Sequence, residues 1–245
     1  MKNEKELRDL IKRFTANDVM HPQLSEPWIV DGVVYATDGK IAIRLDNAAG
    51  LRFEHVQGDR DWRKKAARDL DTWIAESRDA VLGRKKLEPV CLPMSFLRKA
   101  AYTAMDDARK YAVDHYPETT DDIEEMTVDE AVDCYSVVIM PGTKRHVIRA
   151  KYAAIVCDAI DALGPVDFFV PADGFKRGGY GRYRIWCRGE RFDILLMAIR
   201  SDKMGAHGMS VADSATATLV HSISDDSFVS FARLQFLENE VHDGR

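Results

Sequence analysis

Apolar residues recur at helical spacing in several stretches of the chain. In the first of them, apolar side chains fall at i, i+3, i+4 and i+7, namely Leu7, Leu10, Ile11 and Phe14. This spacing puts them on one face, and it predicts a helix over residues 3–14. Further helices are predicted over residues 59–82, 93–115 and 151–163. The stripe of the second is formed by Trp62, Ala66, Leu70, Trp73 and Ile74.

A run of short strands and tight turns occupies residues 28–45. Two Asp-Gly pairs, at 31–32 and 38–39, separate runs that are rich in Val, Ile and Tyr. Asp-Gly is a strong hairpin signal, because both residues tolerate the positive φ of a type I′ turn. We therefore predict three antiparallel strands, near residues 28–30, 33–37 and 40–45.

Extended runs also mark the second half of the chain. Strands are predicted over residues 87–92, 134–140, 146–149, 166–170, 180–187, 191–199 and 216–223. The stretch from Phe192 to Ile199 is almost entirely apolar, which is typical of a central strand buried on both faces. Near the end of the chain, apolar residues at helical spacing predict a helix over 227–241.

The order of these elements divides the chain into four segments. They are a first helix-plus-meander unit (1–58), a helical and acidic insertion (59–133), a β-α-β-β-β unit (134–200) and a C-terminal tail with a docking helix (201–245). The first and third segments share the order helix, strand, strand, strand, which leaves open both an internal duplication and a chance likeness. In either case the predicted fold class is α+β, with antiparallel sheets covered by helices.

The composition is that of an ordinary globular protein, with 46% hydrophobic and 31% charged residues among 245. A net charge of -5 argues against wholesale wrapping of nucleic acid, although local patches can still be basic. The N-terminus is charged, and no apolar run approaches the ~20 residues of a membrane-spanning helix, so we expect a cytoplasmic protein without membrane contact. The four cysteines form no C-x-x-C pair, and we expect buried, reduced thiols.

Sequence motifs of catalytic, metal and cofactor sites are missing from the chain. It lacks a G-x-x-x-x-G-K-[ST] phosphate loop, and its seven histidines form no close pair. The acidic stretch around Asp121 and Glu125 lacks the spacing of a calcium loop and is interpreted as solvated. Asp38 is explained by its turn, since its side chain can accept hydrogen bonds from the following backbone. We therefore predict no catalytic residue, no metal and no cofactor.

Basic and aromatic residues alternate in residues 174–192, which carry six cations against one acid. Cations on phosphates and aromatic rings on bases are the two ingredients of nucleic-acid contact. The residues predicted to make this contact are Lys176, Arg177, Arg182, Arg184, Trp186 and Arg188. The competing interpretation is a solvated hairpin face, because charges on exposed strands also prevent edge-to-edge aggregation.

Four segments share their pattern with one known family. Residues 33–43 read Val-Val-Tyr-Ala-Thr-Asp-Gly-Lys-Ile-Ala-Ile, an apolar strand, a turn and a second strand. Residues 93–100 and 150–160 look like helix starts, and 193–200 look like a last strand that ends in Met-Ala-Ile-Arg rather than Met-Pro-Met-Arg. These patterns resemble those of the DNA sliding-clamp superfamily, the processivity factors of DNA polymerases. The resemblance implies paired β-α-β-β-β units, DNA and replication proteins as partners, and a homo-oligomer.

The leading hypothesis is a non-enzymatic, clamp-like protein that binds DNA or a replication partner, with an origin in a phage or mobile element left open. One alternative is an enzyme with a scattered site, for which Asp38, His146 or Asp173 would have to converge in a cleft. Another is a structural module that uses the tail helix to dock on another chain.

Overall fold

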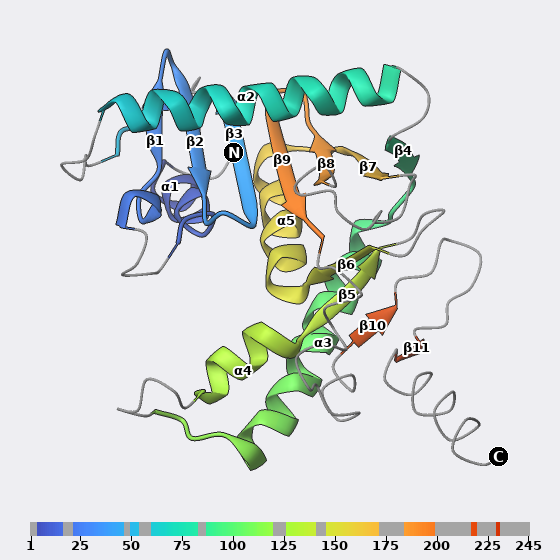
Figure 1. Ribbon diagram of the computed structural model, residues 1–245. Helices are drawn as coiled ribbons and strands as arrows, with labels where there is room; N and C mark the ends of the chain where they lie inside the picture. Colours follow the sequence, from blue (N-terminus) through green and yellow to red (C-terminus); the bar gives the residue numbers. More distant parts are fainter. Residues whose placement is uncertain are drawn as a thin grey trace, which may run out of the picture. The chain divides into compact units, whose positions relative to one another are not determined.

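Five α-helices and eleven β-strands make up the described part of the chain in this computed structural model (Figure 1). The structure describes residues 4–16, 22–46, 50–53, 60–82, 87–119, 126–140, 146–171, 184–198, 217–219 and 229–230. Both element types are well represented, which confirms the predicted α+β class. Among these residues, no helix combines the length and the apolar character needed to cross a membrane.

The chain forms two compact units, whose boundary falls inside helix α5 (Ala150–Leu163). The first unit comprises residues 1–90 and 155–197. It contains α1 (Glu4–Lys12), a 3-10 turn (Pro22–Leu24), β1 (Trp28–Val30), β2 (Val33–Thr37), β3 (Ile41–Asp46), α2 (Arg60–Leu82), β4 (Leu87–Val90), β7 (Asp167–Pro171), β8 (Arg184–Arg188) and β9 (Phe192–Met197). The second unit comprises residues 91–154 and 198–245. The four-segment division expected from the sequence stays a prediction.

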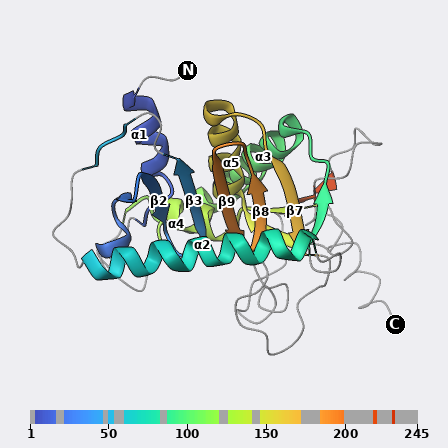
Figure 2. The same ribbon diagram turned by 90° about the horizontal axis from the view of Figure 1, so that it is seen from above.

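A seven-stranded sheet, in the order β1-β2-β3-β9-β8-β7-β4, forms the centre of the first unit. Every neighbouring pair is antiparallel, and the apolar strand β9 lies in the middle of the order, as predicted. Helix α2 crosses one face of this sheet, whereas α1 and α5 lie on the other (Figures 1 and 2). The core under α2 joins Ala67, Leu70 and Ile74 of the helix to sheet residues such as Trp28 and Trp186.

The two Asp-Gly turns of the meander use different chemistry. Asp31 and Gly32 both have positive φ, of 51° and 77°, as a type I′ turn requires. In the second turn only Gly39 has positive φ (86°), so the predicted type I′ turn is wrong there. The Asp38 carboxylate instead accepts hydrogen bonds from the backbone N–H of Lys40 (2.7 Å) and of Ile41 (2.8 Å). Asp38 therefore closes the turn with its side chain, as the sequence predicts.

The central sheet is built from two halves with the same order, α1-β1-β2-β3 and α5-β7-β8-β9. The register of the β2–β3 pair matches that of the β8–β9 pair at a spacing of 151 residues. Tyr35 on β2 lies opposite Arg44 on β3, and their counterparts, Trp186 on β8 (35 to 186) and Leu195 on β9 (44 to 195), also lie opposite each other. Where β3 meets β9, Ile43 lies opposite its own counterpart, Ile194 (43 to 194). The two halves therefore pair around a local pseudo-twofold axis between β3 and β9. This arrangement is what an internal duplication would give, and the duplication itself stays a prediction.

Stacked aromatic pairs occupy equivalent places in the two halves. Trp28 and Tyr35, opposite each other on β1 and β2, stack with ring centroids 6.0 Å apart. Phe169 and Trp186, opposite each other on β7 and β8, stack at 5.1 Å. Both pairs lie in the core under α2, so the helix spans both halves of the sheet.

The second unit contains α3 (Met94–His115), α4 (Val128–Tyr135), β5 (Val137–Met140), β6 (His146–Arg149), β10 (Ala217–Leu219) and β11 (Val229–Ser230). The alanine-rich side of α3 packs against α4 through Ala108, Ala112 and Ala131. The sheet order is β11-β10-β5-β6, and β10 pairs with β5 in parallel, unlike the antiparallel pairing expected throughout.

Two predicted boundaries in this unit differ from the structure. The strand expected from residue 134 begins at Val137, because a capping box between Thr127 and Glu130 starts a helix that continues through Tyr135. The tail helix expected over 227–241 is not seen at Val229–Ser230, which pair with β10 as a strand. The remainder of that stretch lies outside the described residues.

Candidate functional site

Three of the six residues predicted to contact nucleic acid lie outside the described residues, namely Lys176, Arg177 and Arg182. The other three, Arg184, Trp186 and Arg188, alternate along β8 and so share one face of the sheet. That face is the one covered by α2, which supplies core residues against Trp186. The sequence pattern does not indicate the helix that lies on this face.

Trp186 is completely buried, which differs from the surface position that base stacking would require. Its ring stacks on Phe169 inside the core, and its Nε1–H donates a hydrogen bond to Oδ1 of Asp193 (2.9 Å). A buried indole N–H needs such an acceptor, because leaving it unpaired would cost about 1–3 kcal/mol. Trp186 is therefore a core residue of the described structure, and its predicted contact with a base would need the face to be uncovered.

Arg184 lies at the edge of α2, with only 13% of its side chain exposed. Its guanidinium carbon is 3.9 Å from the ring centroid of Trp73 on α2, a cation–π contact. Glu76, one turn further along α2, places a carboxylate oxygen 3.9 Å from the guanidinium. Burial lowers the pKa of the Arg184 guanidinium, and the charge of Glu76 works against this. Both partners come from the helix, so Arg184 ties α2 to β8.

Arg188 is the most exposed of the three, and it already has a carboxylate partner. It donates to Oδ2 of Asp167 on β7 (2.6 Å), and its guanidinium carbon lies 5.2 Å from the ring centroid of Phe169. Arg188 and Asp167 are directly opposite each other in the sheet. Such an exposed pair contributes little to stability, but it lowers the positive charge that a phosphate would meet.

Charges of alternating sign run across the middle of the sheet at one level of the register. Arg44 lies opposite Asp193, Asp193 opposite Arg188, and Arg188 opposite Asp167, on the neighbouring strands β3, β9, β8 and β7. Cross-strand pairs of opposite charge stabilise a sheet, whereas like charges would destabilise it. We call these four residues the charged row.

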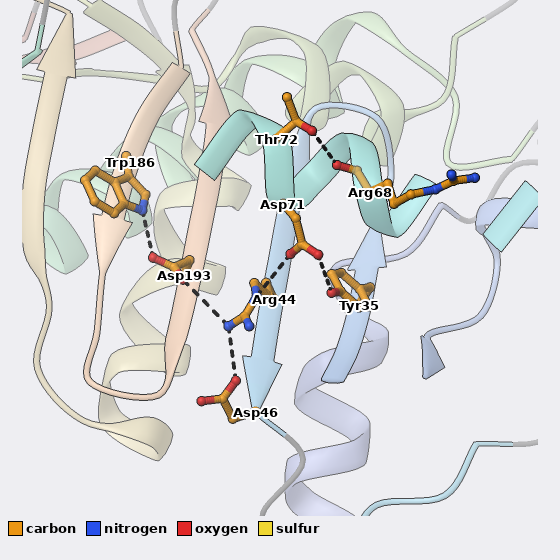
Figure 3. Close-up of polar contacts among 8 residues, drawn as sticks. All are labelled: Tyr35, Arg44, Asp46, Arg68, Asp71, Thr72, Trp186 and Asp193. Carbon is orange, nitrogen blue, oxygen red and sulfur yellow. Dashed lines mark hydrogen bonds and ion pairs between the residues drawn. The ribbon is translucent and has the colours of Figure 1, made fainter. Parts of the chain in front are cut away.

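Helix α2 joins the charged row through one aspartate (Figure 3). Asp71 accepts a hydrogen bond from the Tyr35 hydroxyl (3.0 Å) and another from Nε of Arg44 (3.1 Å). Arg44 also donates to Asp46 (3.1 Å), and its guanidinium lies 4.0 Å from the second oxygen of Asp193. One guanidinium thus holds together the helix, strand β3 and strand β9 next to the pseudo-twofold axis.

The environment shifts the ionisation of three groups in this network. Burial, and then the hydrogen bond to Asp71, raises the pKa of Tyr35. Burial also raises the pKa of Asp193, against the hydrogen bond from Trp186 and the charge of Arg44. Burial opposes the charge of Arg44, but the nearby acids, Asp46 first, outweigh it and raise its pKa. The network therefore contains one carboxylate, Asp193, that is held in its charged form at a cost.

Among the described residues, the candidate groups for metal binding and for a scattered enzyme site lie as follows. No cluster of three or more His, Cys, Asp or Glu side chains suited to a metal occurs among them. The Asp38 carboxylate is engaged by its own turn, His146 is buried on β6, and Asp173 lies outside the described part of the chain. All four cysteines are free thiols. Cys157 and Cys187 are buried as expected, Cys134 is half-buried and Cys91 is exposed.

Sequence reasoning missed Trp73, Asp71 and Arg44 as members of this region. Helical periodicity assigns Trp73 to the buried stripe of α2, yet 36% of it is exposed. Arg44 and Asp71 become partners only when α2 is laid across β3, which no local pattern encodes.

Comparison of the chain with models of known protein families, with curated proteins and with solved structures found no match.

Proposed function

We propose that this chain is a non-enzymatic, clamp-like binding protein that acts in contact with DNA or with a replication protein. The observation that carries the proposal is the repeated order in the central sheet, in which two α-β-β-β halves meet at β3 and β9 around a pseudo-twofold axis. The resemblance to sliding clamps implies paired β-α-β-β-β units, and each half contains the α-β-β-β part of such a unit. The repeat thus supports the proposal through architecture, independently of any single motif.

The polar groups of the described site favour binding over catalysis. The side chains of the charged row have partners inside the protein. Most of these contacts join neighbouring strands, and the one between Arg44 and Asp71 joins the sheet to α2. A general acid or base would need an accessible group with an unsatisfied proton position near a substrate. The carboxylate most perturbed by burial, Asp193, instead accepts the hydrogen bond of a buried indole.

The DNA form of the proposal depends on cations that are available to phosphate. Within the predicted set, Arg184 and Arg188 each lie beside a carboxylate, Glu76 and Asp167 respectively. A phosphate must compete with these carboxylates. The Arg188–Asp167 pair is exposed and therefore weak, whereas the Arg184 side chain is largely buried. Lys176, Arg177 and Arg182 lie outside the described residues and stay predicted contacts.

A titration followed by fluorescence anisotropy tests this proposal. The full-length chain is added to a labelled duplex and to a labelled single strand, each at low and at moderate salt. We expect binding that weakens as salt rises, because neutralising phosphates releases counterions. Failure to bind either DNA at micromolar protein would refute the DNA form and leave only the role with a replication protein.

A further inference from the structure

The outward side of α2 carries a stripe of exposed residues whose charge changes sign at its centre. It consists of Lys65, Arg68, Thr72, Glu76 and Asp79. The charged members lie four and seven residues before and after Thr72, which is the spacing of one side of a helix. Leu70 and Ile74, on the opposite side of α2, pack into the core. We call the five exposed residues the α2 stripe, in which two cations, a neutral centre and two acids follow one another.

The order of these charges is unfavourable within the helix itself. Lys65 and Arg68 lie three residues apart, and like charges at this spacing repel each other. Glu76 and Asp79 repeat this arrangement with acids. Asp79 also lies in the last turn of α2, where the helix dipole favours a cation, and that turn contains no basic residue. The charges of the α2 stripe therefore lower the stability of the helix, and a partner with the opposite order of charges would relieve this cost.

Partners inside the protein compensate little of this charge. Glu76 lies 3.9 Å from the guanidinium of Arg184, but 64% of the Glu76 side chain is exposed. Arg68 donates from Nε to a neutral backbone carbonyl (3.2 Å), and its guanidinium extends away from the other side chains drawn in Figure 3. Lys65 and Asp79 form no ion pair with any residue that the structure describes. The four charges are therefore available to a second molecule.

Two copies of α2 placed antiparallel are complementary along this stripe. A twofold axis through Thr72 places Lys65 opposite Asp79 of the partner subunit. The same axis places Arg68 opposite Glu76 of the partner subunit, and symmetry makes each attractive pair occur twice. The outer pairs lie about 10 Å from the axis, within reach of these side chains when two helices cross at a shallow angle. At the centre, the Thr72 hydroxyl already donates to the Arg68 carbonyl (2.8 Å), so a contact there leaves no side-chain donor unpaired.

We infer that the α2 stripe is the contact surface of a homodimer, in which two copies of this chain pair their α2 helices antiparallel. The inference goes beyond the proposed function and does not depend on DNA binding. A second copy fits better than a partner of one charge, because a polyanion or a basic protein would be attracted by one half of the stripe and repelled by the other. Exposed ion pairs are individually weak and are screened by salt, so the dimer should be weak and should strengthen as salt is lowered.

Sedimentation velocity of the full-length chain, at low and at high salt, tests the dimer. We expect a monomer–dimer equilibrium that shifts towards the monomer as salt rises. Lys65→Glu and Asp79→Lys each replace two attractive pairs by two repulsive ones and should weaken association about tenfold. The matched control is Lys5→Glu, which changes the net charge as Lys65→Glu does. Lys5 is exposed on α1, at the other face of the sheet (Figures 1 and 2), so this variant should associate like the wild type.

Restoring the pairs distinguishes the antiparallel contact from a general effect of charge. The double variant Lys65→Glu/Asp79→Lys has the net charge of the wild type and inverts the outer pairs. It should therefore associate within about threefold of the wild type. A one-to-one mixture of the two single variants should also recover association, because each altered charge then meets the oppositely altered one.

Three results would overturn the inference. The first is a wild type that stays monomeric up to roughly 1 mM protein at low salt. The second is a dimer that both single variants leave intact, which would assign the contact to another face. The third is a loss of association in the single variants that neither the double variant nor the mixture restores. Circular dichroism of each variant checks that it folds.

Discussion

Replacement of Asp193 separates two roles of one buried carboxylate. Its Oδ1 accepts the hydrogen bond of the Trp186 indole, and its second oxygen lies 4.0 Å from Arg44. Asp193→Asn keeps an acceptor for the indole and removes the charge, whereas Asp193→Ala removes both and leaves a buried N–H unpaired. We expect Asp193→Ala to lower the free energy of unfolding by about 2 kcal/mol, the usual cost of an unsatisfied buried donor.

The pH dependence of Asp193→Asn gives the sign of the charge effect. Burial raises the pKa of Asp193 in the folded protein above its ordinary value. The folded state therefore binds this proton more tightly than the unfolded state, and ionisation at neutral pH costs stability. As the pH falls through the raised folded-state pKa towards the ordinary value, that cost is relieved. At neutral pH we expect the free energy of unfolding of Asp193→Asn to equal or exceed that of the wild type. As the pH is lowered, the free energy of unfolding of the wild type should rise relative to that of Asp193→Asn.

Denaturant unfolding followed by tryptophan fluorescence measures both effects. All four tryptophans, Trp28, Trp62, Trp73 and Trp186, belong to the first unit, so the signal reports that unit even if the second unfolds separately. The reasoning would be refuted if Asp193→Asn were as damaging as Asp193→Ala at neutral pH. A stability difference between the wild type and Asp193→Asn that is independent of pH would refute the pKa assignment.

Three further predictions test other parts of the structure. Gly189→Ala should cost about 1–3 kcal/mol, because an added Cβ would lie 2.4 Å from the buried ring of Phe192. In the control, Gly39→Ala, the added Cβ meets no atom within 4 Å, so this variant should lose only about 1 kcal/mol through the strain of its positive φ. Equal losses of unfolding free energy in the two variants, measured in denaturant, would contradict the steric cause. Thr127→Ala removes the N-cap of α4 and should cost about 1 kcal/mol, seen as faster amide hydrogen exchange at the start of that helix and not in α2. In an Ellman's reagent assay, Cys91 should react first and Cys187 only on unfolding, since burial shields Cys187 and raises its pKa; rapid reaction of all four thiols would contradict the packing.

Most secondary structure is predictable from this sequence because its periodic signals are strong. The stripe of Leu10, Ile11 and Phe14 and the Asp-Gly turns reflect local sterics and hydrogen bonding, which the structure retains. Local chemistry also explains the miss at residue 134. There, the capping box at Thr127 and Glu130 outcompetes the β propensity of the residues that follow it.

The face of β8 that carries the predicted contact residues is only half predictable, for a physical reason. Alternation along β8 places Arg184, Trp186 and Arg188 together, but any covering element is chosen by contacts between distant parts of the chain. Helix α2 covers the face because Leu70 and Ile74 complete a core with Trp28 and Trp186. The same packing buries Trp186, which the sequence predicts to contact nucleic acid. It leaves Trp73 exposed, although the sequence places Trp73 in the apolar stripe of its helix.

The salt dependence of duplex binding tests the DNA-contacting role most directly. If only Lys176, Arg177 and Arg182 neutralise phosphates, the slope of log K against log salt is about -2.7, so affinity falls roughly 40-fold between about 50 and about 200 mM salt. If Arg184 and Arg188 exchange their carboxylates for phosphates as well, the slope is about -4.5 and the loss roughly 500-fold. We predict a loss between these two values. Binding that does not change with salt, or no binding at all, would contradict a role in DNA contact.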